Sequence, residues 1–154
     1  MKSLFYNCGF LINGILNVSP REAFELCSEG AVIVDVREEY LNNFRKFDVP
    51  EILFLPLSQL IQKISELPKD KYLIFADSVG LRSKEAVVLL KEKGYIKIAN
   101  MAGGIVDWER DGLPVVTDIS NRLTGSCMCQ LKPRERSKKP NATKTQRHKD
   151  SLRK

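Results

Sequence analysis

The segment 77–83 carries residue types that bind an anion at the end of a strand. It follows a buried apolar run, 72–76, and precedes a helical pattern that starts at Arg82. Backbone N–H groups in such a loop can point inward as a cradle, and the helix N-terminus adds its positive end. Gly80 permits a turn that other residues resist. The segment therefore indicates an oxyanion-binding loop, or an ordinary strand–helix connection in which Asp77 caps the helix. The candidate residues are Asp77, Ser78, Val79, Gly80, Leu81, Arg82 and Ser83.

Two neighbouring thiols form a second candidate site. Cys127 and Cys129 follow Gly125 and Ser126, in a context typical of exposed chain. Such a pair can act as a redox couple, as two ligands for a soft metal, or as sulfur acceptors. Cys-x-Cys alone does not complete a tetrahedral metal site, so the sequence assigns no metal and no cofactor.

The other two cysteines lie in apolar patterns. Cys8 belongs to the apolar stretch 3–16, and Cys27 lies on the apolar face of a helical pattern. Both are expected to be small buried hydrophobic residues. Four cysteines in 154 residues are too few for a disulfide scaffold, and no segment is long and apolar enough to span a membrane. The expected location is the cytoplasm.

Strand-like and helix-like patterns alternate along the chain. Short apolar runs, rich in β-branched residues, are typical of strands that are covered on both faces. Ser19, Pro20 and Glu22 form a capping box that starts a helix. The alternation predicts an α/β fold with a largely parallel central sheet and helices on both faces. Sites in such sheets lie at the carboxyl ends of strands. The predicted strands are 31–36, 52–55, 72–76 and 96–100, with a first strand within 3–16; the predicted helices start near 20, 57, 82 and 104.

Charge is distributed unevenly along the chain. The net charge is +6, yet residues 132–154 hold ten Lys or Arg and two acids, so the rest is slightly acidic. This excludes a uniformly basic nucleic-acid-binding fold. The basic segment contains no aromatic residue, which predicts a disordered tail, a solvated His148 and at most non-specific contact with polyanions. The predicted organisation is a domain over 1–117, a linker with the thiol pair over 118–131, and this tail.

Several separated motifs, in order from about residue 18 to 115, resemble the rhodanese-like family of sulfurtransferases. The resemblance implies a single domain of that fold and an active loop with a Cys, four residues and then an Arg. In the family, the Cys carries a persulfide held by loop amides, and Gly80, Arg82 and Ser83 fit this pattern. The motifs are Ser19-Pro20-Arg21-Glu22-Ala23, Gly30-Ala31, Asp35-Val36-Arg37-Glu38, Pro56-Leu57-Ser58, Gly103-Gly104, Trp108 and Gly112-Leu113-Pro114-Val115.

One departure from the family pattern changes the expected chemistry. Asp77 stands at the position of the family's Cys. A carboxylate cannot hold a sulfane sulfur as a persulfide, because that chemistry needs a polarisable thiolate. We expect the Asp77 carboxylate to accept loop N–H bonds, to pair with Arg82 and to repel thiosulfate. The main hypothesis is a binding or regulatory module around a pseudo-active site, with a protein partner or a small anionic ligand.

Two alternatives retain an enzyme. In one, Cys127 or Cys129 replaces the missing thiol, giving a sulfurtransferase or persulfide carrier. About twelve residues separate Val115 from Cys127 and span up to roughly 40 Å when extended, enough to return to Asp77. In the other, Asp77 is a nucleophile for phosphoryl transfer, but such enzymes need a metal and further acids, which this loop lacks.

Overall fold

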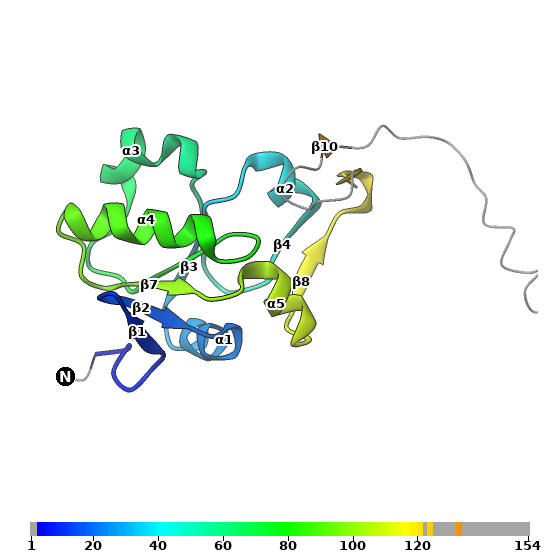
Figure 1. The fold of residues 1–154 in the computed structure, drawn as a ribbon. Coiled ribbons are helices and arrows are strands. Elements are labelled where there is room, and N and C mark those ends of the chain that lie inside the picture. The colour runs from blue at the N-terminus through cyan, green and yellow to red at the C-terminus, as the bar shows by residue number, and fades with distance from the viewer. Residues whose placement is uncertain (1–2, 122, 125–131, 134–154) are drawn as a thin grey trace, which may run out of the picture.

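The computed structural model describes residues 3–121, 123–124 and 132–133. A six-stranded sheet forms its centre, in the order β1-β2-β7-β6-β3-β5 (Figure 1). All neighbouring strands are parallel except β1, which is antiparallel to β2. This confirms the predicted α/β fold with a largely parallel sheet. The strands are β1 (Phe10–Ile12), β2 (Ile15–Val18), β3 (Val32–Asp35), β5 (Ile52–Phe54), β6 (Leu73–Ala76) and β7 (Ile98–Met101).

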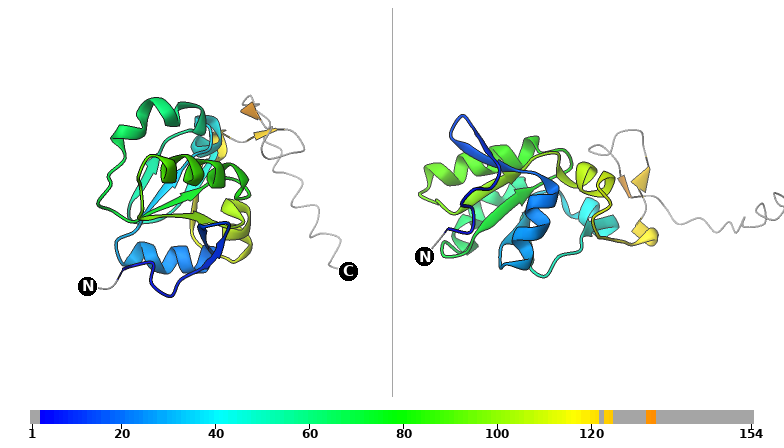
Figure 2. Two further views of the ribbon diagram at one scale, coloured as in Figure 1. Left: turned by 60° about the vertical axis from the view of Figure 1, so that its left-hand side comes forward. Right: turned by 90° about the horizontal axis from the view of Figure 1, so that it is seen from below.

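Helices cover both faces of the sheet, as expected. Helices α3 (Leu60–Lys63) and α4 (Leu81–Glu92) lie on one face, and α1 (Pro20–Ser28) and α5 (Gly104–Arg110) lie on the other (Figures 1 and 2). Successive residues of a strand point to opposite faces, so each strand contributes to two cores. In β3, Val32 and Val34 join the core under α4, whereas Ile33 packs with α1 and α5.

The predicted helix starts have different outcomes. Ser19 accepts from Glu22 N–H and the Glu22 carboxylate accepts from Ser19 N–H, which confirms the capping box of α1. The helical pattern after Leu57 is broken into the 3-10 turn η1 (Leu57–Gln59), the short α3 and the 3-10 turn η2 (Ile64–Glu66). The apolar spacing there places side chains on the core without requiring one continuous helix.

The apolar stretch 3–16 forms more than one strand. β1 and β2 form a hairpin whose turn is Asn13-Gly14, with φ of 52° and 78°. Two successive positive φ angles are typical of the tight turn that Asn-Gly favours, so the dipeptide was a usable signal. All three β1 residues are exposed.

A small two-stranded sheet, β4 (Arg45–Phe47) with β8 (Val115–Thr117), was not predicted from the sequence. Helix α2 (Glu39–Phe44) leads into β4, which pairs in antiparallel fashion with β8. A three-residue strand with two cations gives no periodic signal. Further short elements are η3 (Ile119–Asn121), β9 (Leu123–Thr124) and β10 (Lys132–Pro133). Cys127 and Cys129 lie outside the described residues, as does the predicted tail apart from residues 132–133. The domain bounds therefore stay a prediction.

Candidate functional site: a loop that binds its own carboxylate

The candidate loop lies where the central strands end together. β6 ends at Ala76, its Cα partner in β3 is Asp35, and Asn100 of β7 lies beside Phe75. The carboxyl ends of three neighbouring strands therefore meet at one edge, the position that holds ligands in sheets of this kind. The loop 77–80 leaves this edge, and α4 begins at Leu81.

The Asp77 side chain turns back into its own loop. It is 2% exposed. Oδ1 accepts from the backbone N–H of Gly80 at 2.5 Å, and Oδ2 accepts from that of Arg82 at 3.1 Å. The Ser83 hydroxyl lies 3.2 Å from Oδ1. Hydrogen bonds from N–H groups at a helix N-terminus compensate the burial of a carboxylate, so the loop amides already hold an anionic group.

Helix α5 holds the loop from the other side. The N–H of Ile105 donates to Asp77 O at 2.9 Å, and that of Val106 donates to Ser78 O at 3.1 Å. Gly104, at φ of 59°, allows this approach, because a Cβ there would lie 2.3 Å from Asp77 O. The Gly103-Gly104 motif thus fixes the conformation of the candidate loop.

A buried polar network extends below the loop. Its contact between Asn17 and Asn100 was not predicted from the sequence. The Ser83 hydroxyl lies within hydrogen-bond distance of Asn100 Oδ1 as well as Asp77. Having one proton, it donates to one of them at a time. Asn100 Nδ2 donates to Asn17 Oδ1 at 2.9 Å. An Asn in each of two otherwise apolar strands, β2 and β7, was the available signal.

The expected ion pair between Arg82 and Asp77 is wrong. Only the backbone N–H of Arg82 reaches the carboxylate, and within the described residues its guanidinium makes no ion pair. Arg82 begins the exposed outer face of α4, so its side chain leaves the loop. Val79 and Leu81 are also exposed, at 52% and 68%, whereas Ser78 is buried. The inner side of the loop therefore holds the Asp77 carboxylate, and its outer side exposes two apolar residues and one cation.

A second buried charge lies at the same edge. Arg37 is 3% exposed and contacts Asp35 through Nε at 3.0 Å and Nη2 at 2.7 Å. Nη2 also donates to Arg45 O at 2.8 Å. The Asp35-Val36-Arg37 motif is therefore a closed ion pair that ties β3 to β4, and it offers no free cation to a ligand.

The edge also contains a hollow of about 310 Å³ at the end of β5. Asn42 there is buried, and its Oδ1 has no hydrogen-bond partner among the described residues. An unpaired buried acceptor is uncommon in folded proteins. The lining residues are Glu39, Asn42, Asn43, Lys46, Phe54, Pro56 and Gln59.

Both described cysteines were predicted to be buried, and this is confirmed for Cys27 but not for Cys8. Cys27 is buried as predicted, and burial raises the pKa of its thiol to about 12. Cys8 is only partly buried, at the margin of the core that holds Cys27. Burial, followed by Glu22, Glu29 and Glu25, raises the pKa of Cys8. Neither thiol has the electropositive setting of a reactive cysteine.

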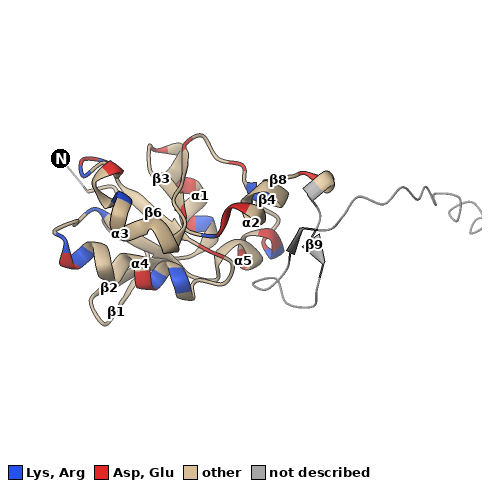
Figure 3. Cartoon of the chain, turned by 90° about the horizontal axis from the view of Figure 1, so that it is seen from above, with Lys and Arg blue, Asp and Glu red and all other residues tan. Residues whose placement is uncertain are grey.

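The described residues contain neither a metal-binding cluster nor a membrane-spanning helix. No three His, Cys, Asp or Glu side chains in the described part of the chain are grouped so that they hold a metal ion. Among those residues, no helix has the length and hydropathy to cross a bilayer. The charged residues of α4 nearest the loop are Arg82, Lys84 and Glu85, so charges of both signs lie at this end of the helix (Figure 3).

Comparisons with known proteins agree with this architecture. The model of the rhodanese-like domain matches residues 19–111. A sulfurtransferase from Allochromatium vinosum is 34% identical over 89 residues, covering 58% of this chain and 81% of its own. Thiosulfate sulfurtransferase GlpE from Haemophilus influenzae is 30% identical over 102 residues, covering 65% and 93%. A rhodanese-related protein from Thermoplasma volcanium superposes with a TM-score of 0.60 at 28% identity, covering 66% of this chain and 98% of that one.

The site is a strand–loop–helix connection at the carboxyl edge of a mostly parallel sheet, in which backbone N–H groups hold the Asp77 carboxylate. The chain belongs to the rhodanese-like domain family. Its relatives at about 30% identity are named sulfurtransferases.

Proposed function

We propose that this chain is a rhodanese-like binding or regulatory module that does not transfer sulfur through position 77. The observation that carries the proposal is the Asp77 carboxylate, which is buried and accepts the N–H groups of Gly80 and Arg82. In the rhodanese-like family, the resemblance implies that an anionic sulfur species occupies this place. Here the protein supplies the negative charge itself, so a second anion would meet both repulsion and missing donors.

The chemistry of transfer supports the same conclusion. A thiolate attacks the sulfane sulfur of thiosulfate, the S–S bond breaks, and sulfite leaves while the thiolate becomes a persulfide. A carboxylate at the same place offers only oxygen, which forms no comparable bond to sulfur. Asp77 therefore lacks the group that the first step requires, although the loop around it keeps its cradle.

The outer face of the loop is the proposed contact surface. Val79 and Leu81 are apolar and exposed, and the Arg82 guanidinium is exposed beside them. Apolar residues held on a rigid loop, with a cation at the rim, suit a protein partner better than a small anion. The rigid support comes from the α5 N–H groups that hold Asp77 and Ser78.

The test is mass spectrometry of the full chain after incubation with thiosulfate or a cysteine persulfide. Three proteins are compared: wild type, Asp77→Cys, and Asp77→Ser as a control that removes the carboxylate without adding a thiol. We expect one added sulfur on residue 77 of Asp77→Cys and none at residue 77 of the other two. If Asp77→Cys also stays unmodified, the cradle is not competent and the proposal of a silenced site fails.

A second candidate function is supported by the names of the relatives, which are sulfurtransferases. In this alternative, Cys127 or Cys129, both outside the described residues, accepts the sulfur. The same experiment separates the two functions, because peptide mapping places any added sulfur. Sulfur on Cys127 or Cys129 of the wild type, lost in a double Cys→Ser variant, would establish the carrier function and displace the binding module.

A further inference from the structure

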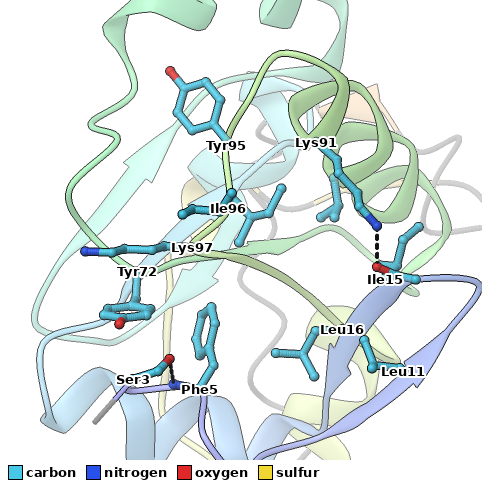
Figure 4. Close-up of a pocket in the computed structure, with 13 residues that line it drawn as sticks. Ser3, Phe5, Leu11, Ile15, Leu16, Tyr72, Lys91, Tyr95, Ile96 and Lys97 are labelled. Atoms are coloured by element: carbon cyan, nitrogen blue, oxygen red, sulfur yellow. Dashed lines mark hydrogen bonds between the residues drawn. The ribbon is translucent and has the colours of Figure 1, made fainter. Parts of the chain in front are cut away.

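A groove of about 670 Å³ lies at the opposite edge of the sheet from the Asp77 loop (Figure 4). It opens where β2, β6 and β7 begin, since Ile15, Tyr72 and Ile98 all contribute to its walls. Its volume is within the range of about 300–1,000 Å³ that is typical of small-molecule sites. The lining residues are Ser3, Phe5, Leu11, Gly14, Ile15, Leu16, Tyr72, Val87, Lys91, Tyr95, Ile96, Lys97 and Ile98.

The surface of the groove is mainly apolar. Phe5 packs edge-on against Tyr72, with ring centroids 4.9 Å apart, and forms part of the floor. The Tyr95 hydroxyl is occupied by the carbonyls of Ile64 and Leu67, so this residue offers its ring to the groove rather than a polar group. A ligand here would contact hydrocarbon over most of its length.

Two large aliphatic side chains on the rim are left in water. Ile96 is 85% exposed and Leu11 is 71% exposed. They belong to elements that are distant in sequence, the segment before β7 and the hairpin strand β1, and both line the same groove (Figure 4). Covering them with an apolar ligand would remove this surface from water, which favours binding by roughly 25 cal/mol for each Å² buried.

The charged side chains that line the groove, Lys91 and Lys97, are both cationic. Lys91 Nζ donates to Gly14 O at 2.6 Å, which leaves two N–H groups of its ammonium for a ligand. Lys97 Nζ lies 5.0 Å from the centre of the Tyr72 ring and 3.4 Å from Asp70 O. Of the described residues that line the groove, none is acidic. The groove therefore has a positive character that no side chain of its own lining neutralises.

One wall of the groove is built from chain outside the match to the family. Ser3, Phe5 and Leu11 precede residue 19, where the rhodanese-like match begins. The hairpin is held against α4 by the Lys91–Gly14 bond, so the wall has a defined position. A property that depends on this wall belongs to this chain and does not follow from the family's active loop.

We propose that this groove binds a small amphipathic anion, an alkyl or aryl carboxylate. The hydrocarbon part lies against Phe5, Leu11 and Ile96, and the carboxylate lies near the ammonium group of Lys91; the ammonium group of Lys97 lies on the other side of the groove (Figure 4). Charge complementarity selects an anion, and the apolar walls select a hydrocarbon body. The proposal is independent of Asp77, which lies at the other edge of the sheet.

The test is calorimetric titration of the full chain with decanoate, beside decanol and decyltrimethylammonium as neutral and cationic probes of the same chain length. We expect decanoate to bind more tightly than either control and to shift NMR signals of Leu11, Tyr72 and Ile96. Lys91→Gln, whose side-chain amide can still donate to Gly14 O, should weaken decanoate about threefold, as expected for the loss of an exposed charge contact. Higher salt should weaken it as well.

Ile96→Glu gives the sharpest variant, because this side chain is exposed and does not support the core. It places a negative charge on the rim and removes apolar contact, so decanoate affinity should fall about tenfold. Ile119→Glu is the matched control, since Ile119 is 72% exposed and does not line the groove. Circular dichroism verifies that both variants fold.

Three results would overturn the proposal. One is a wild type that binds decanoate no more tightly than decanol. Another is a set of NMR shifts that lies outside the groove. The third is a wild-type dimer in sedimentation that Ile96→Glu dissociates, because the groove would then be an interface between two copies of the chain.

Discussion

At the carboxyl edge of the sheet, Asp77 supplies an anion to its own loop, whereas at the amino edge Lys91 and Lys97 line a groove with no acidic partner among the described residues. The first site is filled by one buried carboxylate, which accepts the N–H groups of Gly80 and Arg82. The second leaves Ile96 and Leu11 in water. We propose that Asp77 closes the site that the family uses while the fold persists; residues ahead of the family match form one wall of the groove.

The largest expected effect concerns the buried ion pair at the carboxyl edge of the sheet. Arg37→Leu removes one member of the buried Asp35–Arg37 pair and leaves the other charge without its partner. The free energy of unfolding should fall by about 3–5 kcal/mol. Urea titration followed by circular dichroism measures it.

Arg110→Leu is the matched control, because Arg110 pairs with Asp107 at the surface. Its loss should cost less than about 1 kcal/mol. Similar losses of unfolding free energy for the two substitutions would show that the buried Asp35–Arg37 pair stabilises the fold no more than a surface ion pair does.

The next effect concerns the contact between α5 and the loop. Gly104→Ala would place a Cβ 2.3 Å from Asp77 O, so backbone must move. We expect a loss of roughly 2–4 kcal/mol in unfolding free energy and shifted NMR signals for Gly80 and Arg82.

Gly30→Ala separates backbone strain from this collision, because Gly30 also has a positive φ but nothing lies within 4 Å of the added Cβ. It should cost about 1 kcal/mol, with the loop signals unchanged. Equal effects at Gly30 and Gly104 would mean that the collision with the loop does not matter.

The smallest expected effect concerns Cys27, which lies in the core between the sheet and helices α1 and α5. Burial raises the pKa of the Cys27 thiol from its ordinary 9.0 to about 12 in the folded chain. Above pH 9 the unfolded chain releases this proton while the folded chain keeps it, so stability is present below pH 9 and falls as the pH rises. The loss is at most about 1.4 kcal/mol per pH unit. Cys27→Ala should show a shallower decline between pH 9 and pH 10; identical slopes would contradict this assignment.

Local patterns in the sequence predicted the frame well. Strands β3, β5 and β6 were visible as short apolar runs, and the capping box located the start of α1. These features depend on neighbouring residues alone. The β4–β8 pair was not visible, because its strands are short and 68 or more positions apart in the chain, so pairing depends on tertiary packing.

The site was predicted in part. The position of Asp77 and the role of the loop amides followed from the strand–loop–helix pattern. The direction of the Arg82 side chain did not, because it depends on which face of α4 is covered. The Asn17–Asn100 contact joins residues far apart in sequence, and the groove depends on how the hairpin lies against α4.

The most direct test of the closed loop is a titration with thiosulfate, followed through the backbone N–H signals of Gly80 and Arg82. Wild type and Asp77→Ala are compared, because alanine removes the carboxylate and empties the cradle. We predict that thiosulfate shifts these signals only in Asp77→Ala and leaves the wild type unchanged. Equal shifts in both proteins would contradict the claim that Asp77 occupies the anion site.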